Sequence, residues 1–279
     1  MRALERSHPL VAFCYLLSVL GVTVFSRNPV VLFEAFLGAF SLAALSARLK
    51  GAGWVLLTAA VVAITNPLFV HSGDTALFFI GNAAYTLEAL CYGAAFGLML
   101  SAAVLWGICS ARYMTSDKYI WFFGRILPSA GLVLSCALRF VPLFISRTGE
   151  FFALRKNEGI KGFFKAFGAA VSYSAEEAMS AADSMKSRGY ASGRRTFYSP
   201  CRFTLRDGAA LGFILISMAA FFVLSAFGAG SFFYYPSLSA LSFGLCDIAL
   251  YAFFGALCLF PSAVILAEKI RRRSVRTAL

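Results

Sequence analysis

A charged segment, Ala182-Asp183-Ser184-Met185-Lys186-Ser187-Arg188-Gly189-Tyr190, interrupts a chain in which 60% of the 279 residues are hydrophobic. Its residue types suit a helix end that meets a partner. Arg188 falls in the last helical turn, where its guanidinium is a planar fork of hydrogen-bond donors that fits an acidic pocket. The same side chain could instead interact with the end of its own helix or with lipid phosphates.

Two local signals bound the helix that carries this end. Ser174-Ala175-Glu176-Glu177 has the capping-box pattern and predicts a start near Ser174. Gly189 predicts the end, because glycine readily takes the left-handed conformation that follows a helix. Small and adaptable side chains recur at spacings of three and four, which predicts a face that another helix approaches closely. These side chains are Ala175, Ala178, Ala182 and Met185, followed by Gly189.

A second helix is predicted upstream, from Pro142 to Glu158, with Gly159 ending it. Gly159 and Gly189 both follow polar and basic residues. This repetition suggests two similar partner surfaces, such as the two halves of a dimer. Helices often end in glycine after a basic residue, so the pattern alone does not require a partner.

Long apolar runs define the elements that must position this region. A membrane span needs about 20 apolar residues, and six segments come close to or exceed that length. The sequence therefore predicts an all-α integral membrane protein with about six transmembrane helices. The apolar run from Ile126 to Leu138 has only 13 residues and is bracketed by Arg125 and Arg139, which favours an interfacial or buried helix. The predicted spans are roughly 9–26, 29–48, 53–70, 84–111, 208–229 and 238–267.

The net charge of +12 is first a signal of topology. With six spans and both termini in the cytoplasm, every basic residue except Arg27 falls on the cytoplasmic side, as the positive-inside rule requires. We therefore expect no nucleic-acid partner. The chain divides into a membrane part of four spans (1–111), a cytoplasmic region (112–206), and a second membrane part of two spans with a basic tail (207–279).

Few residues suit a metal or a cofactor. The chain has seven cysteines without a Cys-x-x-Cys pair, and only His8 and His71 as imidazoles. A zinc or haem site lacks ligands, and no Gly-x-x-x-x-Gly-Lys-Ser/Thr loop is present to hold nucleotide phosphates. We predict no metal, no cofactor and no catalytic residues.

These features resemble a known family, the transmembrane T component of energy-coupling factor (ECF) transporters, the EcfT/CbiQ-like proteins. The segment from Ala182 to Tyr190 looks like the family's second coupling motif, an Ala-Arg-Gly-type tripeptide at a helix end, with Ser187 in the alanine place. Ala137-Leu138-Arg139-Phe140-Val141-Pro142 is similar to the segment that opens the first coupling helix. The resemblance covers nearly the whole chain, and further matches are His8-Pro9-Leu10, Asn28-Pro29, Asn66-Pro67-Leu68-Phe69 with Gly73, and Thr86-Leu87-Glu88.

One position departs from the family. The first coupling motif falls on Asn157-Glu158-Gly159, where Glu158 occupies the arginine place. A carboxylate cannot repeat a guanidinium's contact with an acidic groove. Arg155 or Lys156 would supply the charge instead, or the two partner subunits differ and this contact has the opposite polarity.

The resemblance implies a coupling subunit of a multi-pass micronutrient importer in a prokaryotic plasma membrane. Its partners would be two cytoplasmic ABC-type ATPases, which hydrolyse ATP, and a membrane-embedded S component, which selects a vitamin or a transition-metal ion. The ATPases would dock on Ser187-Arg188-Gly189 and on the region from Arg155 to Gly159, while Ala178, Ala182, Met185, Arg139 and Pro142 would shape the coupling helices.

Two other classes remain open. A membrane-embedded enzyme acting on a phosphorylated or lipid substrate would place acids at the membrane boundary, and the acids in or near the spans are Glu34, Glu88 and Asp247. A stand-alone secondary transporter would show repeated halves, unlike the four-plus-two layout found here.

Overall fold

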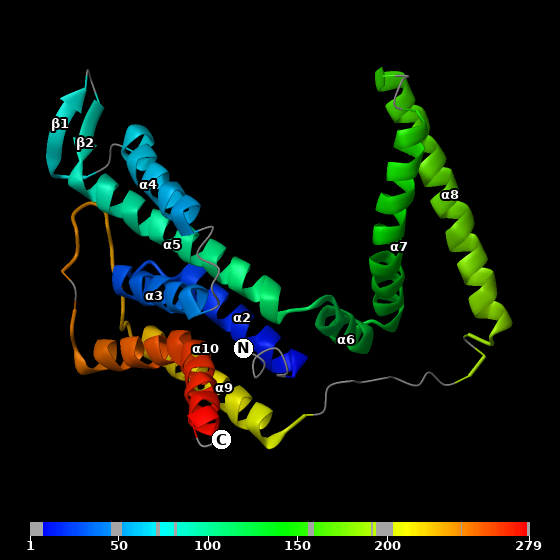
Figure 1. Ribbon diagram of the computed structural model, residues 1–279. Helices are drawn as coiled ribbons and strands as arrows, with labels where there is room; N and C mark the ends of the chain where they lie inside the picture. Colours follow the sequence, from blue (N-terminus) through cyan, green and yellow to red (C-terminus); the bar gives the residue numbers. More distant parts are fainter. Residues whose placement is uncertain are drawn as a thin grey trace. The chain divides into compact units, whose positions relative to one another are not determined.

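The computed structural model describes residues 8–45, 52–70, 73–80, 83–155, 159–190, 192–193, 203–240 and 242–277. The chain forms two compact units (Figure 1). The first consists of Met1–Thr115 and Cys201–Leu279, and the second of Ser116–Pro200.

In its described residues, the first unit is a bundle of six helices with one β-hairpin. Its elements are α2 (Pro9–Phe25), α3 (Pro29–Leu45), α4 (Ala52–Phe69), β1 (Ala76–Ile80), β2 (Ala83–Thr86), α5 (Leu87–Tyr113), α9 (Leu205–Ala226) and α10 (Leu245–Thr277). The second unit contains α6 (Ser116–Ile126), α7 (Pro128–Leu154) and α8 (Gly159–Ser187). Almost all of the described chain is therefore helical, as the sequence predicts.

Four of the described helices are long and apolar enough to cross a membrane: Leu87–Tyr113, Ser129–Leu154, Leu205–Ala226 and Leu245–Arg271. The helices Pro9–Phe25, Pro29–Leu45 and Gly53–Phe69 are apolar but shorter. Ser129–Leu154 was not among the six predicted spans. The run from Ile126 to Leu138 is not a short helix of its own, because Ile126 ends α6 and the rest continues into the 27 residues of α7.

Local start signals mislead at two places in the second unit. The predicted helix start at Pro142 is wrong, because Pro142 lies inside α7. The predicted start at Ser174 is also wrong, because Ser174 lies inside α8 and its hydroxyl donates to the Ala170 carbonyl one turn earlier (2.7 Å). A Ser-x-x-Glu pattern caps a helix only where the preceding backbone is not helical.

The β-hairpin was not predicted. β1 pairs antiparallel with β2, with Ala76 opposite Thr86 and Ile80 opposite Ala83. The span predicted to begin at residue 84 therefore begins at Leu87, where the Thr86 hydroxyl accepts a hydrogen bond from the Ala89 amide (3.4 Å). This N-cap satisfies one of the free N–H groups of α5.

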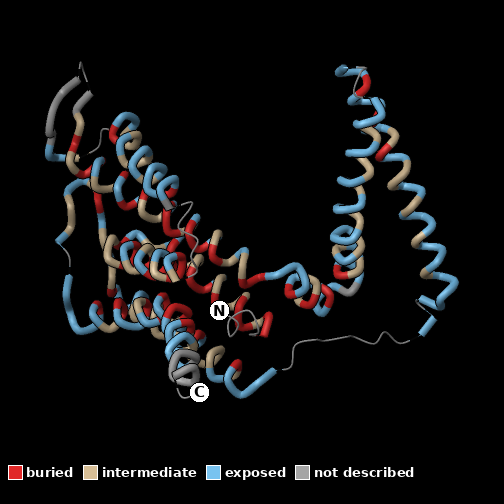
Figure 2. The backbone as a smooth tube through the Cα atoms, viewed as in Figure 1, coloured by how far each residue is buried: buried red, intermediate tan, exposed pale blue. Residues whose placement is uncertain are grey.

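α5 lies at the centre of the first unit and contacts α2, α3 and α4, while α10 contacts α3 and α9. Figure 2 shows buried residues along these helices. Trp106 is fully buried and donates its indole N–H to the Ala35 carbonyl (3.2 Å). Tyr15 donates its hydroxyl to the Leu257 carbonyl (3.1 Å). These bonds join α5 to α3 and α2 to α10.

Polar contacts tie sequence-distant segments at one end of this bundle. The Asn28 amide donates to the Gly230 carbonyl (3.1 Å) and to the Tyr251 hydroxyl (2.8 Å). Tyr234 donates to the Arg27 carbonyl (3.0 Å). Burial raises the pKa of Tyr234 to about 12, so this hydroxyl keeps its proton at neutral pH. The turn between α2 and α3 is thus held against the loop that precedes α10.

A second set of contacts ties the opposite helix ends. The His8 amide donates to the Asp207 carboxylate (3.2 Å), and the amide and hydroxyl of Thr204 donate to the same carboxylate (3.1 and 2.7 Å). The start of α2 therefore meets the start of α9. Asp207 also completes a capping box with Thr204 at the start of α9.

The close contact between α4 and α5 depends on glycine. A Cβ atom at Gly97 would lie 2.5 Å from the Ala59 carbonyl oxygen, and one at Gly93 would lie 2.8 Å from the Ala63 oxygen. The sequence Gly93-x-x-x-Gly97 thus lets the backbones meet, as small residues do between membrane helices.

We expect Gly97→Ala to destabilise the protein by about 1–3 kcal/mol, because the added methyl group overpacks the α4–α5 contact. Gly107→Ala is the matched control, since it lies on the same helix with no atom near its Cβ position. Thermal unfolding in detergent is the measurement. Equal melting temperatures for the two variants would contradict the close approach of α4 and α5.

Candidate partner-docking site

α8 ends in a fully hydrogen-bonded cap. The Tyr190 amide donates to the Met185 carbonyl (3.0 Å) and the Gly189 amide to the Lys186 carbonyl (2.9 Å). Gly189 has a left-handed backbone with φ of +78°. This pair of bonds is the Schellman motif, which fixes the chain reversal after a helix. The predicted left-handed glycine is therefore confirmed.

The side chains at this end are open to a partner. Ser187 and Arg188 are exposed, and the Ser187 hydroxyl donates back to the Ser184 carbonyl (2.9 Å). Within the described residues, Arg188 forms no ion pair. The backbone of this end is thus rigid while its guanidinium remains available.

The face of α8 that packs differs from the predicted face by about one residue. Gly162, Ala166 and Ala170 are buried, and Ala181 and Met185 are half-buried farther along the helix. Among the predicted residues, Ala178 and Ala182 are exposed and only Met185 turns inward. Ala178 and Ala182 therefore border the open side of the helix near Arg188.

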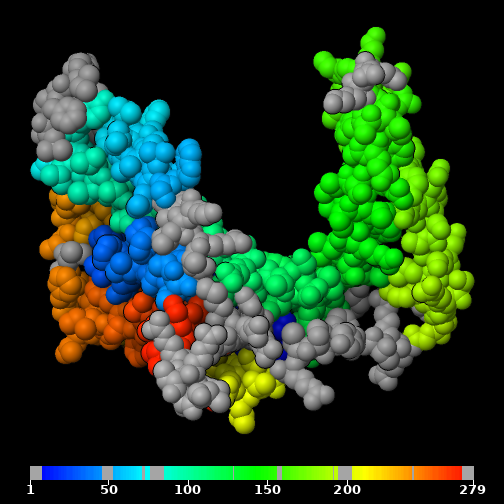
Figure 3. All heavy atoms as spheres, in the orientation of Figure 1, coloured from blue at the N-terminus to red at the C-terminus, as the bar shows by residue number. Residues whose placement is uncertain are grey.

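α7 packs on the first half of α8 through aromatic rings. Phe152 stacks on Phe163 with ring centroids 4.7 Å apart, and Phe144 meets Phe167 edge to face at 6.2 Å. Toward their far ends the two helices spread apart (Figure 1). In the view of Figure 3 the outer surface of α8, in yellow-green, is uncovered. The half of α8 that ends at Arg188 is therefore the less packed half.

Sequence reasoning missed a contact that links these helices. Arg147 forms an ion pair with Glu150 (2.9 Å), and its guanidinium carbon lies 5.4 Å from the centroid of the Tyr173 ring on α8. The spacing of three between Arg147 and Glu150 was the available signal. Tyr173 could not be assigned as the aromatic partner, because the predicted helices did not include it.

The predicted first motif is not a helix end like the second. α7 ends at Leu154 with Arg155 as its C-cap, and the Arg155 amide donates to the Phe152 carbonyl (3.2 Å). Gly159 has a left-handed φ of +61°, yet it begins α8 and does not end a helix. Lys156, Asn157 and Glu158 lie outside the described residues. Gly159 and Gly189 thus occupy different structural positions.

Arg139 and Pro142 are both exposed on α7. Pro142 breaks no helix there, although proline removes one backbone hydrogen bond. α7 is almost uncovered, since only 6% of its most apolar stretch is buried. So long an apolar helix needs lipid or a partner surface around it.

Of the three acids that an enzyme could use, two accept hydrogen bonds from neighbouring groups and the third lies apart from them. Glu88 accepts hydrogen bonds from the Thr75 hydroxyl (2.7 Å) and amide (3.3 Å). Asp247 accepts from the Gly230 amide (2.7 Å) and the Gly244 amide (3.1 Å). Glu34 faces Gly255 across the contact between α3 and α10, and within the described chain its Oε2 atom has no hydrogen-bond partner. Among the same residues, no three His, Cys, Asp or Glu side chains gather as metal ligands.

We expect Gly189→Ala to loosen the end of α8 by about 1 kcal/mol, because a Cβ atom at left-handed φ is strained. The substitution should lower the hydrogen-exchange protection of the Tyr190 amide about fivefold. Gly168→Ala is the control, since its Cβ position on the same helix is open. Unchanged protection in Gly189→Ala would show that the Schellman cap is not formed.

Comparison with known proteins does not identify the chain. No protein-family model matches it, and no curated protein matches it significantly. The geometry of α8 and of the first unit is therefore the ground for assigning a function.

Proposed function

We propose that this chain is the transmembrane coupling subunit, or T component, of an ECF-type micronutrient importer. The observation that carries the proposal is the exposed end of α8, where a Schellman cap holds an exposed Arg188 that forms no ion pair with the described residues. A fixed cationic fork suits an acidic groove on a partner. The partner we assign to it is one of two cytoplasmic ABC-type ATPases.

The second unit has two surfaces of different chemistry. α7 presents apolar side chains such as Val133 and Ile145, which are 67% and 65% exposed. The end of α8 presents Lys186, Ser187 and Arg188. In the proposed complex the apolar surface lies against lipid or the S component, and the polar end lies against an ATPase. The packed rings between α7 and α8 would transmit motion from one surface to the other.

The first unit supports a membrane-embedded role. Asn28 meets Gly230 at one end of the bundle and His8 meets Asp207 at the other, so α2 and α9 run in the same direction. Six consecutive crossings would give the first and the fifth helix this shared direction. It agrees with the proposed topology, in which both termini and the second unit are cytoplasmic.

ATP would drive transport by changing how the ATPase dimer contacts the ends of the coupling helices. Closure of an ATPase dimer shifts the coupling helices only if the closed dimer binds their ends differently from the open dimer. A backbone cap keeps α8 from fraying under that load, so the motion reaches α7. The sequence has no Gly-x-x-x-x-Gly-Lys-Ser/Thr loop, so in this proposal the ATPase subunits bind and hydrolyse ATP.

The two docking contacts would be unequal. Arg188 ends a helix, whereas Gly159 begins one and follows Glu158 in the sequence. One ATPase would then receive a guanidinium, and the other would meet the link between α7 and α8 near Arg155. Partner subunits of different sequence would suit this arrangement.

We expect Arg188→Glu to abolish recovery of ABC-type ATPases when the chain is purified from membranes of its own host. The reversed charge would repel an acidic groove, and substrate uptake should fall in parallel. Arg27→Glu is the control, because it reverses an exposed charge in the first unit, outside both proposed docking contacts. ATPase recovery and uptake that match the wild type in Arg188→Glu would refute the docking role.

The topology has its own test. In a background without native cysteines, Tyr190→Cys and Ser274→Cys should both react with a membrane-impermeant thiol reagent only after the cytoplasmic face is opened. Both positions lie in basic regions that the positive-inside rule places in the cytoplasm. Labelling of the two positions from opposite faces would show an odd number of crossings between them.

A further inference from the structure

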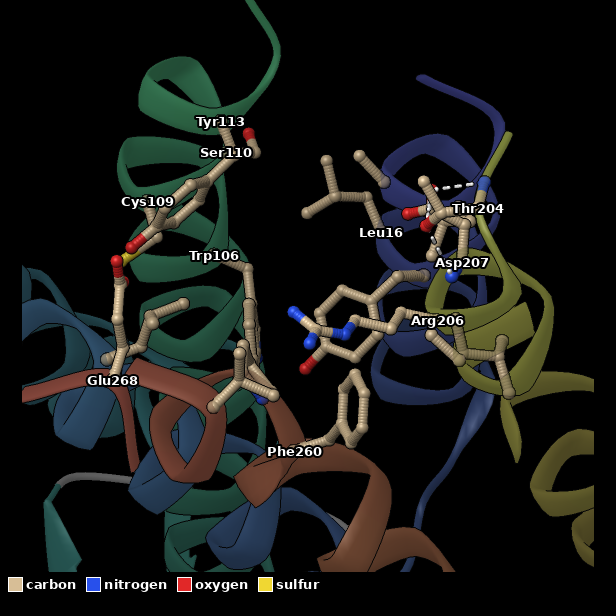
Figure 4. Close-up of a pocket in the computed structure, with 18 of the residues that line it drawn as sticks. Leu16, Trp106, Cys109, Ser110, Tyr113, Thr204, Arg206, Asp207, Phe260 and Glu268 are labelled. Carbon is tan, nitrogen blue, oxygen red and sulfur yellow. Dashed lines mark hydrogen bonds between the residues drawn. The ribbon is translucent and has the colours of Figure 1, made fainter. Parts of the chain in front are cut away.

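The first unit contains a large cavity near the starts of α2 and α9 and the end of α5. Its volume is about 860 Å³, within the range of roughly 300–1,000 Å³ that is usual for small-molecule sites. Its walls come from α2, α3, α5, α9 and α10 (Figure 4). Val11, Ile214 and Phe260 are among the apolar side chains that line it.

The polar groups in these walls already have partners. The Tyr15 hydroxyl donates to the Leu257 carbonyl and the Trp106 indole to the Ala35 carbonyl. Asp207 accepts hydrogen bonds from His8 and Thr204. Water in the cavity would therefore find few groups to bind, whereas a hydrocarbon chain would lose contact with water at no cost in hydrogen bonds.

Arg206 is the exception. Its side chain extends from the start of α9 into the cavity, as Figure 4 shows. Arg206 is exposed, and in the described part of the chain it forms no ion pair. Glu268 lies on another wall, on the side of Tyr113. The cavity thus combines an apolar interior with one available guanidinium, which matches an amphiphile with an anionic head.

The position of the cavity favours a membrane lipid. α2 and α9 begin here and α5 ends here, at the bundle end that the charge distribution places in the cytoplasm. Anionic lipids concentrate in the cytoplasmic leaflet, and arginine binds phosphate through two parallel hydrogen bonds.

We infer that this cavity binds an anionic phospholipid, with one acyl chain among Val11, Trp106 and Phe260 and the phosphate on Arg206. The bound lipid fills space between α2, α5, α9 and α10. The inference requires that the first unit be embedded in a membrane, but it does not depend on ATPase docking.

Trp106 provides a reporter inside the cavity. It lines the wall and is fully buried, so lipid around the protein reaches it poorly. The full-length chain with Trp54→Phe and Trp121→Phe leaves Trp106 as the only tryptophan. It is reconstituted in phosphatidylcholine vesicles that contain a small fraction of phosphatidylglycerol with brominated acyl chains, which quench indole fluorescence on contact.

We expect brominated phosphatidylglycerol to quench Trp106 well below the concentration at which brominated phosphatidylcholine does so. Arg206→Gln should weaken this preference about tenfold, because the phosphate loses a charge-assisted bidentate contact. Arg27→Gln, which removes a positive charge at the opposite bundle end, should leave the preference unchanged. Ala210→Phe, which fills part of the cavity, should reduce quenching by both lipids.

Equal quenching by the two brominated lipids in the parent protein would overturn the inference. So would an unchanged preference in Arg206→Gln, which alters no core residue and therefore keeps the test decisive if Ala210→Phe fails to fold. No ATPase takes part in the measurement, so its result is separate from that of the docking experiment.

Discussion

The polar contacts at the helix ends constrain which ends of the first unit's helices can meet. In an apolar chain the free backbone groups at a helix end need partners, since hydrocarbon offers none. Asn28 and Asp207 supply those partners across about 200 positions of sequence. Each of these hydrogen-bonded contacts joins two helix ends, and together the contacts determine which ends meet. The up-and-down order of the helices thus follows from where these few polar groups find hydrogen-bond partners.

Side-chain size then decides how closely the tied helices pack. Gly93 and Gly97 bring α5 onto the backbone of α4, and Gly38 similarly admits α10, since a Cβ atom there would lie 2.7 Å from Cys258 Cβ. Near the starts of α2 and α9 and the end of α5, the rings of Tyr15, Trp106 and Phe260 line the cavity.

Long apolar runs predicted most helix positions in the first unit. A run of this kind must be buried or in contact with lipid, whichever helices it packs against. Gly189 was also predictable, since the left-handed cap is a local property. Pro142 and Ser174 misled because a proline or a Ser-x-x-Glu pattern does not reveal whether the previous turn is already helical. The packed face of α8 depends on where α7 lies, and no local signal contained that information. The cavity depends on how five helices pack together, so local sequence signals did not predict it either.

In the second unit, the packing between α7 and α8 and the proposed partner contact lie at different places along one helical hairpin. Near the turn, Phe152 and Phe163 hold α7 and α8 together, and Arg147 adds a cation–π contact to Tyr173. Toward its far end α8 spreads away from α7 (Figure 1), and a Schellman cap orders its last turn. A helix end ordered by its own backbone keeps its geometry whether or not a partner is present. Binding at Arg188 would then require little ordering of the chain, so more of the interaction free energy would remain for moving the hairpin.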